Sequence, residues 1–387
     1  MKKIKIYIFL LITFFLHCCQ KNSENIIKKN SIDIKSISIE RKDIKSLMCI
    51  GKIKEAVKLE TKDNSLIGNV DLVIRDGNGD FYVGDYYSSK KIFRFDKNGN
   101  FITCFGRIGQ GPGEYKNILS FALNSDNSVV LLTSLKLIKF DRNGKLIKEV
   151  RINYFAKDIT IIDDLIYIFV LRYRHSPKIK KAIIILDSDL KKVGEMSTYD
   201  TRLEKYLCLP KRIFAKSNGK LCFIDIYDLK LNIFNPKNNE IYFLSIPNEN
   251  YNLDLIWKKR KLIEKDYKEI RTRIHRFNLI FGMKDRIFLK ESCVEKNIYY
   301  NAWILNLEKR KAIIFPYLKI CRYSDKEILP NICFNFIAGS YNKGVIGVFD
   351  SVERFNKYKR DFPALKDIEF NIEDNPILAL FEFNKIE

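Results

Sequence analysis

Short runs of alternating apolar and polar residues, a turn phrase that recurs at regular spacing, and matching strand-like segments near both ends predict an all-β protein. The expected architecture is a six-bladed β-propeller of four-stranded antiparallel blades, with a helical insertion in a late blade. Of the 387 residues, 46% are hydrophobic and 13% aromatic, which is enough for a large core. This composition excludes a disordered chain and a small disulfide scaffold.

The first blade has the clearest pattern. Four strand-like runs alternate with turns built from Gly, Asn and Asp, the residues that tight turns favour. The runs are Asp71–Asp76, Phe81–Asp85, Lys91–Phe95 and Phe101–Phe105.

The turn phrase of this blade returns along the chain. Phe95-Asp96-Lys97-Asn98-Gly99 is echoed by Phe140-Asp141-Arg142-Asn143-Gly144, and looser copies follow. The phrases are anchored at residues 96, 141, 187, 235, 306 and 384, with gaps of 45, 46, 48, 71 and 78. A repeat of about 40–50 residues with four strands is typical of a propeller. The two longer gaps predict insertions in the fifth and sixth blades.

Two terminal segments are expected to close the ring. The run Glu55–Leu59 precedes the first blade, and Ile377–Phe381 ends the chain. Pairing them within one blade would cover two sheet edges that would otherwise stay open for aggregation.

The insertions are expected at about residues 250–280 and 351–375. Within the first, residues 255–277 place apolar side chains at helical spacing opposite a strongly basic face, which predicts a helix on the rim of the propeller. The basic face is either solvated or in contact with a membrane surface or an anionic polymer. The second insertion has a mixed pattern, loop-like or helical.

The N-terminus carries an export signal. A basic start is followed by the apolar run Ile6–Leu16, which is too short to span a bilayer. Leu16-His17-Cys18-Cys19 then resembles a bacterial lipobox with Cys19 as the lipidated residue. Cys18 is an alternative site, and an ordinary secretory signal is the alternative interpretation.

The predicted domains are therefore a signal peptide at 1–19, a polar tether at 20–45 and the propeller at 46–387. We expect no transmembrane helix and a lipid anchor in the bacterial cell envelope, because two or more acyl chains bind a membrane stably. The outer membrane is the expected membrane. The periplasmic side is favoured over the cell surface, because no acidic cluster directly follows Cys19.

The segment Phe105-Gly106-Arg107-Ile108-Gly109-Gln110-Gly111-Pro112-Gly113-Glu114-Tyr115 resembles the characteristic loop of a family of six-bladed β-propeller lipoproteins of anaerobic gut bacteria. These are relatives of NHL-repeat propellers and are largely uncharacterised. The resemblance extends to the first blade, to the lipobox and to Glu373–Leu378. It implies the same fold and the same anchoring. In residues 160–340 the turn phrases degrade, and the limits of the blades are less defined there.

This loop has two interpretations. Its glycines permit positive φ and Pro112 fixes a turn, so that it forms a rigid connector between blades in which Arg107 and Glu114 pair. Alternatively it faces a ligand, together with the loop after Phe81–Asp85. The candidate ligand-facing residues are Asp85, Tyr86, Arg107, Gln110, Glu114 and Tyr115.

The formal net charge of +22 raises the question of a nucleic-acid partner. We expect none, because an exported lipoprotein rarely meets nucleic acid. Lysine is also spread evenly among Ile and Asn, a pattern typical of AT-rich coding. The expected binding partner, besides the membrane, is an envelope protein or an acidic glycan.

Catalytic residues are scarce. His175 and His275 lie far apart and do not suffice for a metal site of the lyase type. A calcium site would need carboxylate ligands such as Asp76, Asp85 and Asp163. The simpler interpretation of these three residues is that they stabilise turns and strand ends. We therefore expect no cofactor and no metal. The seven cysteines after Cys19 have no paired spacing and are expected to be mostly buried small side chains.

The predicted function is therefore that of a membrane-anchored envelope propeller whose loops bind a glycan, a peptide or a protein. The alternative is a metal-dependent hydrolase or lyase that uses the central channel. A purely structural role in an envelope assembly is a third interpretation, and it predicts a large exposed apolar patch.

Overall fold

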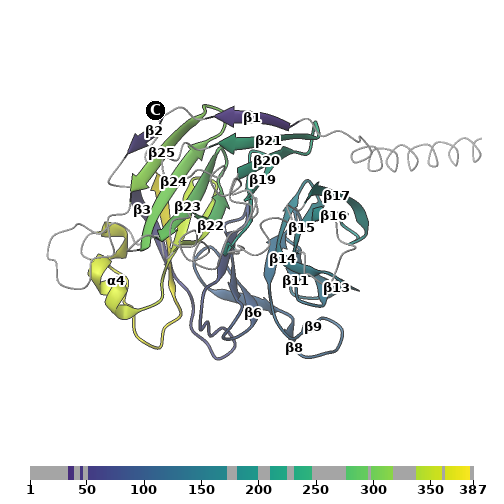
Figure 1. The fold of residues 1–387 in the computed structure, drawn as a ribbon. Helices are drawn as coiled ribbons and strands as arrows, with labels where there is room; N and C mark the ends of the chain where they lie inside the picture. Colours follow the sequence, from purple (N-terminus) through teal and green to yellow (C-terminus); the bar gives the residue numbers. More distant parts are fainter. Residues whose placement is uncertain are drawn as a thin grey trace, which may run out of the picture.

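The computed structural model describes residues 34–38, 44–46, 51–171, 181–198, 210–224, 231–245, 276–294, 298–316, 337–359 and 362–383. This part of the chain is almost entirely β-structure with a propeller-like arrangement of sheets (Figure 1). It contains one α-helix, α4 (Val352–Lys359), and one short 3₁₀-helix, η4 (Pro363–Leu365). The all-β prediction is confirmed.

Sets of four antiparallel strands follow one another along the chain. In the first three sets the strands pair in sequence order. Their bounds are β4 (Leu72–Arg75), β5 (Phe81–Asp85), β6 (Lys91–Phe95) and β7 (Phe101–Phe105); β10 (Ser120–Leu123), β11 (Val129–Leu132), β12 (Lys136–Phe140) and β13 (Leu146–Arg151); β14 (Phe155–Ile162), β15 (Leu165–Leu171), β16 (Lys181–Leu186) and β17 (Lys192–Thr198).

The later sets follow the same order, and the last one takes its fourth strand from the N-terminal part of the chain. Their bounds are β18 (Phe214–Ser217), β19 (Lys220–Ile224), β20 (Leu231–Asn235) and β21 (Glu240–Ser245); β22 (Arg276–Gly282), β23 (Arg286–Val294), β24 (Ile298–Asn306) and β25 (Lys311–Pro316); β26 (Ile337–Tyr341), β27 (Gly344–Phe349), β28 (Ile377–Phe383) and β3 (Gly51–Lys58).

The repeated phrase forms the turn between the third and fourth strands of a set. In the first set the Asp96 carboxylate accepts hydrogen bonds from the backbone N–H groups of Asn98 and Asn100, each at 2.8 Å. Asp141 and Asp187 do the same in the next two sets. An acidic or amide side chain at the start of the turn thus satisfies backbone donors that would otherwise be unpaired. The phrase predicted these turns correctly.

The first strand of each set lies innermost. Contacts between these inner strands run from β4 through β10, β14, β18, β22 and β26 and return to β4. β26 and β4 pair in parallel, with Gly339 opposite Val73. A Cβ at Gly339 would overlap the backbone of Val73, so the close approach of these two strands requires glycine.

β3 and β28, the two segments expected to pair, form an antiparallel ladder in which Ile377 lies opposite Lys58 and Leu378 opposite Val57. Leu378 is completely buried, and Leu380 nearly so. The outer edge of β28 is therefore covered by a strand from the other end of the chain.

The tether predicted for residues 20–45 extends too far toward the C-terminus, because two segments of it form strands. β1 (Ile34–Ser38) pairs in parallel with β21, and β2 (Ile44–Ser46) pairs in parallel with β25. Figure 1 shows both short strands lying along the outer edges of these sheets. An outermost strand carries a row of unpaired backbone N–H and C=O groups, and an extended segment that passes along it pairs with them.

Only part of the expected insertions can be compared with the structure. Most of the predicted helix at 255–277 lies outside the described residues. The helix prediction is wrong for residues 276 and 277, because Arg276 begins the inner strand β22. The second insertion contains α4, whose Phe355 and Tyr358 are buried. Their rings lie 5.8 and 5.9 Å from the ring of Phe349 on β27.

The core is built from the apolar faces of the sheets. Phe81, Phe95 and Phe121 are completely buried, and the aromatic side chains pack between neighbouring sheets. Cys222 lies among them, and burial raises the pKa of its thiol to about 12. Cys104 is half-buried, and both are free thiols. No helix in the described residues is long and apolar enough to cross a membrane.

Candidate functional site

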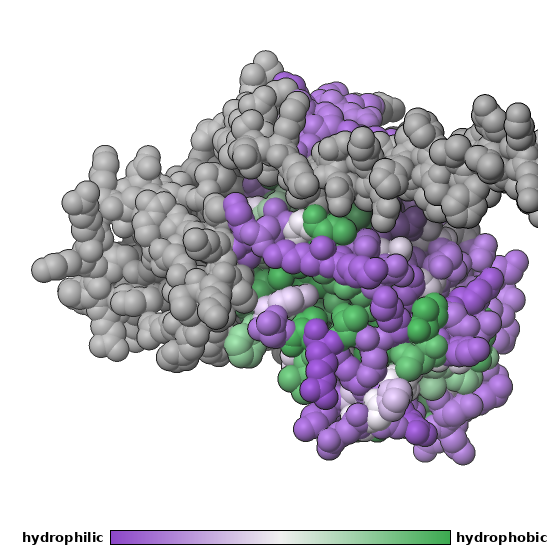
Figure 2. All heavy atoms as spheres, turned by 90° about the vertical axis from the view of Figure 1, so that its right-hand side faces the viewer, coloured by the Kyte–Doolittle hydropathy of each residue, from purple (hydrophilic) through white to green (hydrophobic). Residues whose placement is uncertain are grey.

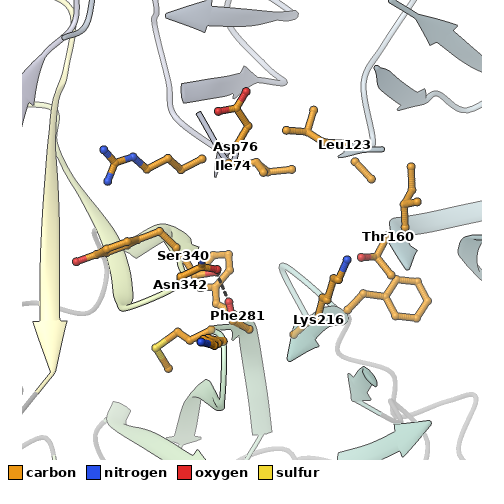
Figure 3. A pocket seen from close by; sticks show the side chains of 18 of the residues that line it. Ile74, Asp76, Leu123, Thr160, Lys216, Phe281, Ser340 and Asn342 are labelled. Atoms are coloured by element: carbon orange, nitrogen blue, oxygen red, sulfur yellow. Dashed lines mark hydrogen bonds between the residues drawn. The ribbon is translucent and has the colours of Figure 1, made fainter. Parts of the chain in front are cut away.

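A cavity of about 480 Å³ lies between the inner strands, and β4, β10, β14, β18, β22 and β26 all contribute residues to its wall. Figure 3 shows side chains from several of these strands around the open space, among them Ile74, Leu123, Thr160, Lys216 and Phe281. The wall combines apolar and polar side chains and is more polar than most small-molecule sites.

The rim of the cavity is formed by the turns that follow the inner strands. Five lining residues in these turns are exposed, each after a different inner strand: Gly77, Ser125, Asn218, Lys284 and Asn342. The cavity is therefore accessible from the end of the sheets at which the inner strands terminate.

Lys216 is the charged side chain that borders the open space. It lies in β18, where the neighbouring residues Ala215 and Ser217 are buried while Lys216 is exposed. Figure 3 shows the ammonium of Lys216 and the hydroxyl of Thr160 directed into the cavity. No hydrogen bond or ion pair links this ammonium to another residue within the described ranges.

The backbone of Lys216 is held in place by the next inner strand. A Cβ at Gly282 of β22 would overlap the carbonyl oxygen of Lys216. The Ser340 hydroxyl of β26 in turn donates a hydrogen bond of 2.7 Å to the carbonyl oxygen of Gly282. Three consecutive inner strands are therefore packed closely at the level of the lysine, which fixes the position from which its side chain extends.

Asp76 and Asn124 end two other inner strands at the same rim. The Asp76 Oδ1 atom accepts hydrogen bonds from the N–H groups of Asn78 and Asp80, both at 2.9 Å, and Figure 3 shows its carboxylate directed away from the cavity. Asn124 is 8% exposed and donates through Nδ2 to the Ser128 hydroxyl, while its Oδ1 atom is buried without a partner. A buried carbonyl oxygen without a hydrogen-bond donor is energetically costly.

Asp158 of β14 lies closer to the starting ends of the inner strands. Its carboxylate connects β14 to β10 and β18. Its Oδ1 atom accepts the Ser120 hydroxyl at 2.7 Å, and its Oδ2 atom accepts the N–H groups of Ile213 and Phe214 at 2.8 and 3.1 Å. Arg212 lies 3.6 Å from the same carboxylate. Asp158 is 2% exposed, so this group serves the architecture of the site.

The predicted loop lies at the opposite end of the sheets, between β7 and β10. Its strands β8 (Arg107–Ile108) and β9 (Glu114–Tyr115) pair in parallel. The Glu114 carboxylate accepts the Arg107 guanidinium at 2.6 Å and the Gly111 N–H at 2.9 Å. The Gly111 N–H and then Arg107 lower the pKa of Glu114 below its usual 4.5. The expected pairing of Arg107 with Glu114 is confirmed.

Tyr115 anchors the loop. Its hydroxyl donates to the carbonyl oxygens of Phe105 at 2.9 Å and Lys90 at 3.1 Å, which ties the loop to the one after β5. Burial raises the pKa of Tyr115 well above its ordinary value. Gly106 has a φ of +66°, and a Cβ there would meet the Tyr115 ring, so glycine is required. These contacts match the interpretation of the loop as a rigid connector.

The loop also borders a second cavity, of about 440 Å³, which Gln110, Glu114 and Tyr115 line together with residues of the β11–β12 turn and of β13. Figure 2 shows the side of the molecule that carries β13 and β17, on which apolar side chains are grouped between polar ones. Leu135 and Ile147 are among the exposed apolar residues of these sheets. This surface is a second candidate for ligand or partner binding.

The other two predicted loop residues have structural contacts. The completely buried Asp85 accepts four backbone N–H groups, those of Gly68, Asn69, Ser88 and Ser89. Tyr86 donates its backbone N–H to Asp71 at 2.8 Å, and burial strongly raises the pKa of its hydroxyl.

The six predicted residues therefore lie together at the starting end of the inner strands, and three of them line the second cavity. Cys19 lies outside the described residues. Sequence reasoning missed Lys216 and Asn124. The available signal was a single lysine inside the buried strand Phe214–Ser217.

The described part of the chain contains no cluster of metal-ligating side chains. Within the described ranges, no three His, Cys, Asp or Glu side chains lie close enough to hold a metal ion. Asp76 and Asp85 lie at opposite ends of β5, and Asp163 forms part of the β14–β15 turn. His175 and His275 are not among the described residues.

The fold and the central cavity define an all-β, propeller-like protein. By sequence, the chain belongs to the family described as "Domain of unknown function (DUF4934)", whose model matches residues 29–382. A comparison with curated proteins finds no match.

A solved structure shows the same fold at low identity, and others match more weakly. The chain is similar to a Bacteroides fragilis protein assigned as exported, at 19% identity and a TM-score of 0.67, over 91% of this chain and 100% of that one. The WD40 domain of Neurospora crassa Pan2 matches at 10% identity and a TM-score of 0.38, over 82% and 77% of the two chains. PorZ of Porphyromonas gingivalis, a surface component of its type-IX secretion system, matches at 8% and 0.37, over 76% and 36%.

Proposed function

We propose that this protein is an exported six-bladed propeller, anchored in the bacterial envelope through Cys19, that binds a small polar ligand such as the end of a glycan. The cyclic order of contacts among β4, β10, β14, β18, β22 and β26 supports six blades. The ladder between β3 and β28 supports closure within the last blade. We propose domain limits of 1–19 for the signal peptide, 20–33 for the tether and 34–387 for the propeller with its two N-terminal edge strands.

Export and anchoring are supported by the pattern Leu16–Cys19 and by the similarity to a Bacteroides fragilis protein assigned as exported. Residues 20–33 would connect the lipid to β1. Fully extended, this tether reaches about 50 Å. The periplasmic face of the outer membrane remains the proposed location. A Cys19→Ser variant is expected in the soluble fraction, and its retention in the membrane pellet would contradict the anchor.

The central cavity is the observation that carries the binding function. Its volume of about 480 Å³ falls within the range of small-molecule sites, about 300–1,000 Å³. Among the described residues the ammonium of Lys216 has no partner, so a ligand would supply one. The closely packed inner strands hold the backbone of Lys216 in a fixed position, which reduces the entropy lost on binding.

The test is to obstruct the rim. Asn342 is exposed, lines the cavity and has no role in the strand ladder, so Asn342→Trp should fold normally and narrow the entrance. Asn98→Trp, in an exposed turn outside the cavity, is the matched control. The full mature protein is titrated with a panel of neutral and acidic mono- and oligosaccharides and short peptides, with thermal shift and calorimetry as readouts.

We expect at least one class of compound to bind the wild type and the Asn98→Trp variant, and to bind Asn342→Trp at least tenfold more weakly. If nothing in the panel binds, or if the obstructed variant binds as the wild type does, the cavity is not the binding site and the proposal is wrong.

A further inference from the structure

We propose that the ligand of the central cavity is a carboxylated sugar whose carboxylate binds the ammonium of Lys216 and the hydroxyl of Thr160. This inference rests on the proposed function and specifies the chemistry of the same site.

The cavity presents an uncompensated positive charge. Of the two arginines in its wall, Arg75 donates to the Gly79 carbonyl oxygen and stacks on Phe81 and Tyr341, and Arg212 faces Asp158. Lys216 has no such partner within the described ranges. Because Lys216 is exposed, its ammonium stays hydrated, and an anion would be held by this charge together with hydrogen bonds from the wall of the cavity.

The charge count favours a monoanion. One ammonium points into the cavity, and the next lysine of the wall, Lys284, is exposed at the rim. A carboxylate is neutralised by a single ammonium, and its second oxygen can accept the Thr160 hydroxyl. A phosphate monoester would bring up to two negative charges and leave one of them without a partner.

A zwitterion such as an amino acid fits less well. Its ammonium would need an acceptor carboxylate facing the cavity. Asp76, the acidic residue of the wall, is directed away from the cavity: its Oδ1 atom accepts two backbone N–H groups, and its Oδ2 atom is buried without a partner among the described residues. The remaining polar groups of the wall are neutral hydroxyls and amides. Asn342 is exposed at the rim, the exposed Ser125 hydroxyl donates to the Asp164 carboxylate at 2.9 Å, and the Oδ1 atom of Asn124 is buried without a partner among the described residues.

Hydroxyl groups are the ligand donors and acceptors that complement such neutral groups, because each hydroxyl both donates and accepts. The apolar side chains Ile74, Leu123 and Phe281 offer surface for the C–H face of a sugar ring. A ligand with one carboxylate and several hydroxyls thus matches both the single cation and the rest of the wall.

The experiment compares pairs of sugars that differ only at the carboxylate. The mature protein is titrated calorimetrically with D-glucuronate and D-glucose, and with D-galacturonate and D-galactose. Glucose 6-phosphate and L-alanine serve as the dianion and zwitterion arms. The variants are Lys216→Met, which keeps the length of the side chain without its charge, and Lys216→Arg, which keeps the charge. Lys191→Met, in the exposed turn before β17, is the matched control.

We expect one of the uronates to bind at least about tenfold more tightly than its neutral partner, as a charge-assisted hydrogen bond provides. Lys216→Met should reduce this ratio to near one, whereas Lys216→Arg and Lys191→Met should keep most of it. Added salt should weaken uronate binding to the wild type and leave that of the neutral sugar unchanged.

The outcomes separate this inference from the proposed function. If sugars bind in the cavity but uronates have no advantage, or if glucose 6-phosphate or alanine binds more tightly, the carboxylate assignment is wrong and the cavity remains a binding site. If no compound binds and Asn342→Trp changes nothing, both the inference and the proposed function are wrong.

Discussion

Replacing Asp158 by alanine tests whether a single buried carboxylate holds the inner strands in register around the cavity. Asp158 is 2% exposed on β14. It accepts the Ser120 hydroxyl of β10 at 2.7 Å and the N–H groups of Ile213 and Phe214 at the start of β18 at 2.8 and 3.1 Å. One side chain therefore joins elements of three successive sets of strands.

The expected cost follows from these contacts. A hydrogen bond to a charged group contributes about 1.5–3 kcal/mol, and such terms in one network are not additive. Alanine would also leave buried N–H groups without an acceptor and Arg212, 3.6 Å away, without its counter-ion. We expect Asp158→Ala to lower the free energy of unfolding by about 3–5 kcal/mol. Asp158→Asn should cost nearly as much, because its amide can face either the Ser120 hydroxyl or the two N–H groups as an acceptor, but not both.

Urea unfolding followed by circular dichroism measures this difference. The control is Asp189→Ala, in the exposed turn between β16 and β17, which should change the free energy of unfolding by less than about 0.5 kcal/mol. A loss below about 1 kcal/mol for Asp158→Ala would refute the conclusion that this carboxylate joins the inner strands.

Two further predictions address the close packing and the loop. Gly282→Ala should lower the free energy of unfolding by more than about 2 kcal/mol, because the added Cβ overlaps the Lys216 backbone. Gly77→Ala, with no atom within 4 Å of its Cβ, should change it little, and equal effects in urea unfolding would contradict this packing. For Glu114, whose pKa is lowered, the contribution to loop stability is present above the unfolded pKa and is lost as pH falls through the lower folded pKa. The Gly111 amide signal in NMR should therefore titrate with a midpoint below pH 4.5 and should lose this titration in Glu114→Gln; a midpoint at or above 4.5 would contradict the assignment.

The repeated turn phrase was sufficient to predict most of the fold. The phrase works because Gly99 and Gly144 adopt positive φ, at +91° and +87°, at the same place in two turns. In the third turn Leu190 adopts a φ of +62°. Once a non-glycine residue adopts this conformation, the sequence no longer marks the turn, and for this reason the pattern became faint in the later sets.

The short N-terminal strands could not be predicted in the same way. β1 and β2 pair in parallel with outermost strands and have five and three residues. Their pairing depends on backbone groups of β21 and β25, so their own side-chain pattern carries little information. A segment without a clear pattern was therefore read as a tether.

The cavity site was missed for a related reason. Lys216 lies on β18, Thr160 lies on β14 and Asn124 directly follows β10. These positions are far apart in the sequence, and the arrangement of the inner strands brings them to one cavity. The predicted loop, in contrast, is contiguous and rich in glycine, which made it conspicuous. In the structure those glycines give room to the Glu114 and Tyr115 side chains, so the loop's conspicuous composition reflects its internal packing.

The two ends of the sheets differ in the segments that connect the strands. At one end the inner strands terminate in short turns held by Asp or Asn side chains, and these turns form the rim of the cavity. At the other end lie the β7–β10 loop and the insertion that contains α4. Short, hydrogen-bonded turns keep a binding site in a fixed geometry, while longer segments tolerate insertions without disturbing it. Ligand binding at the rim and partner contacts at the opposite end are therefore physically compatible on one rigid scaffold.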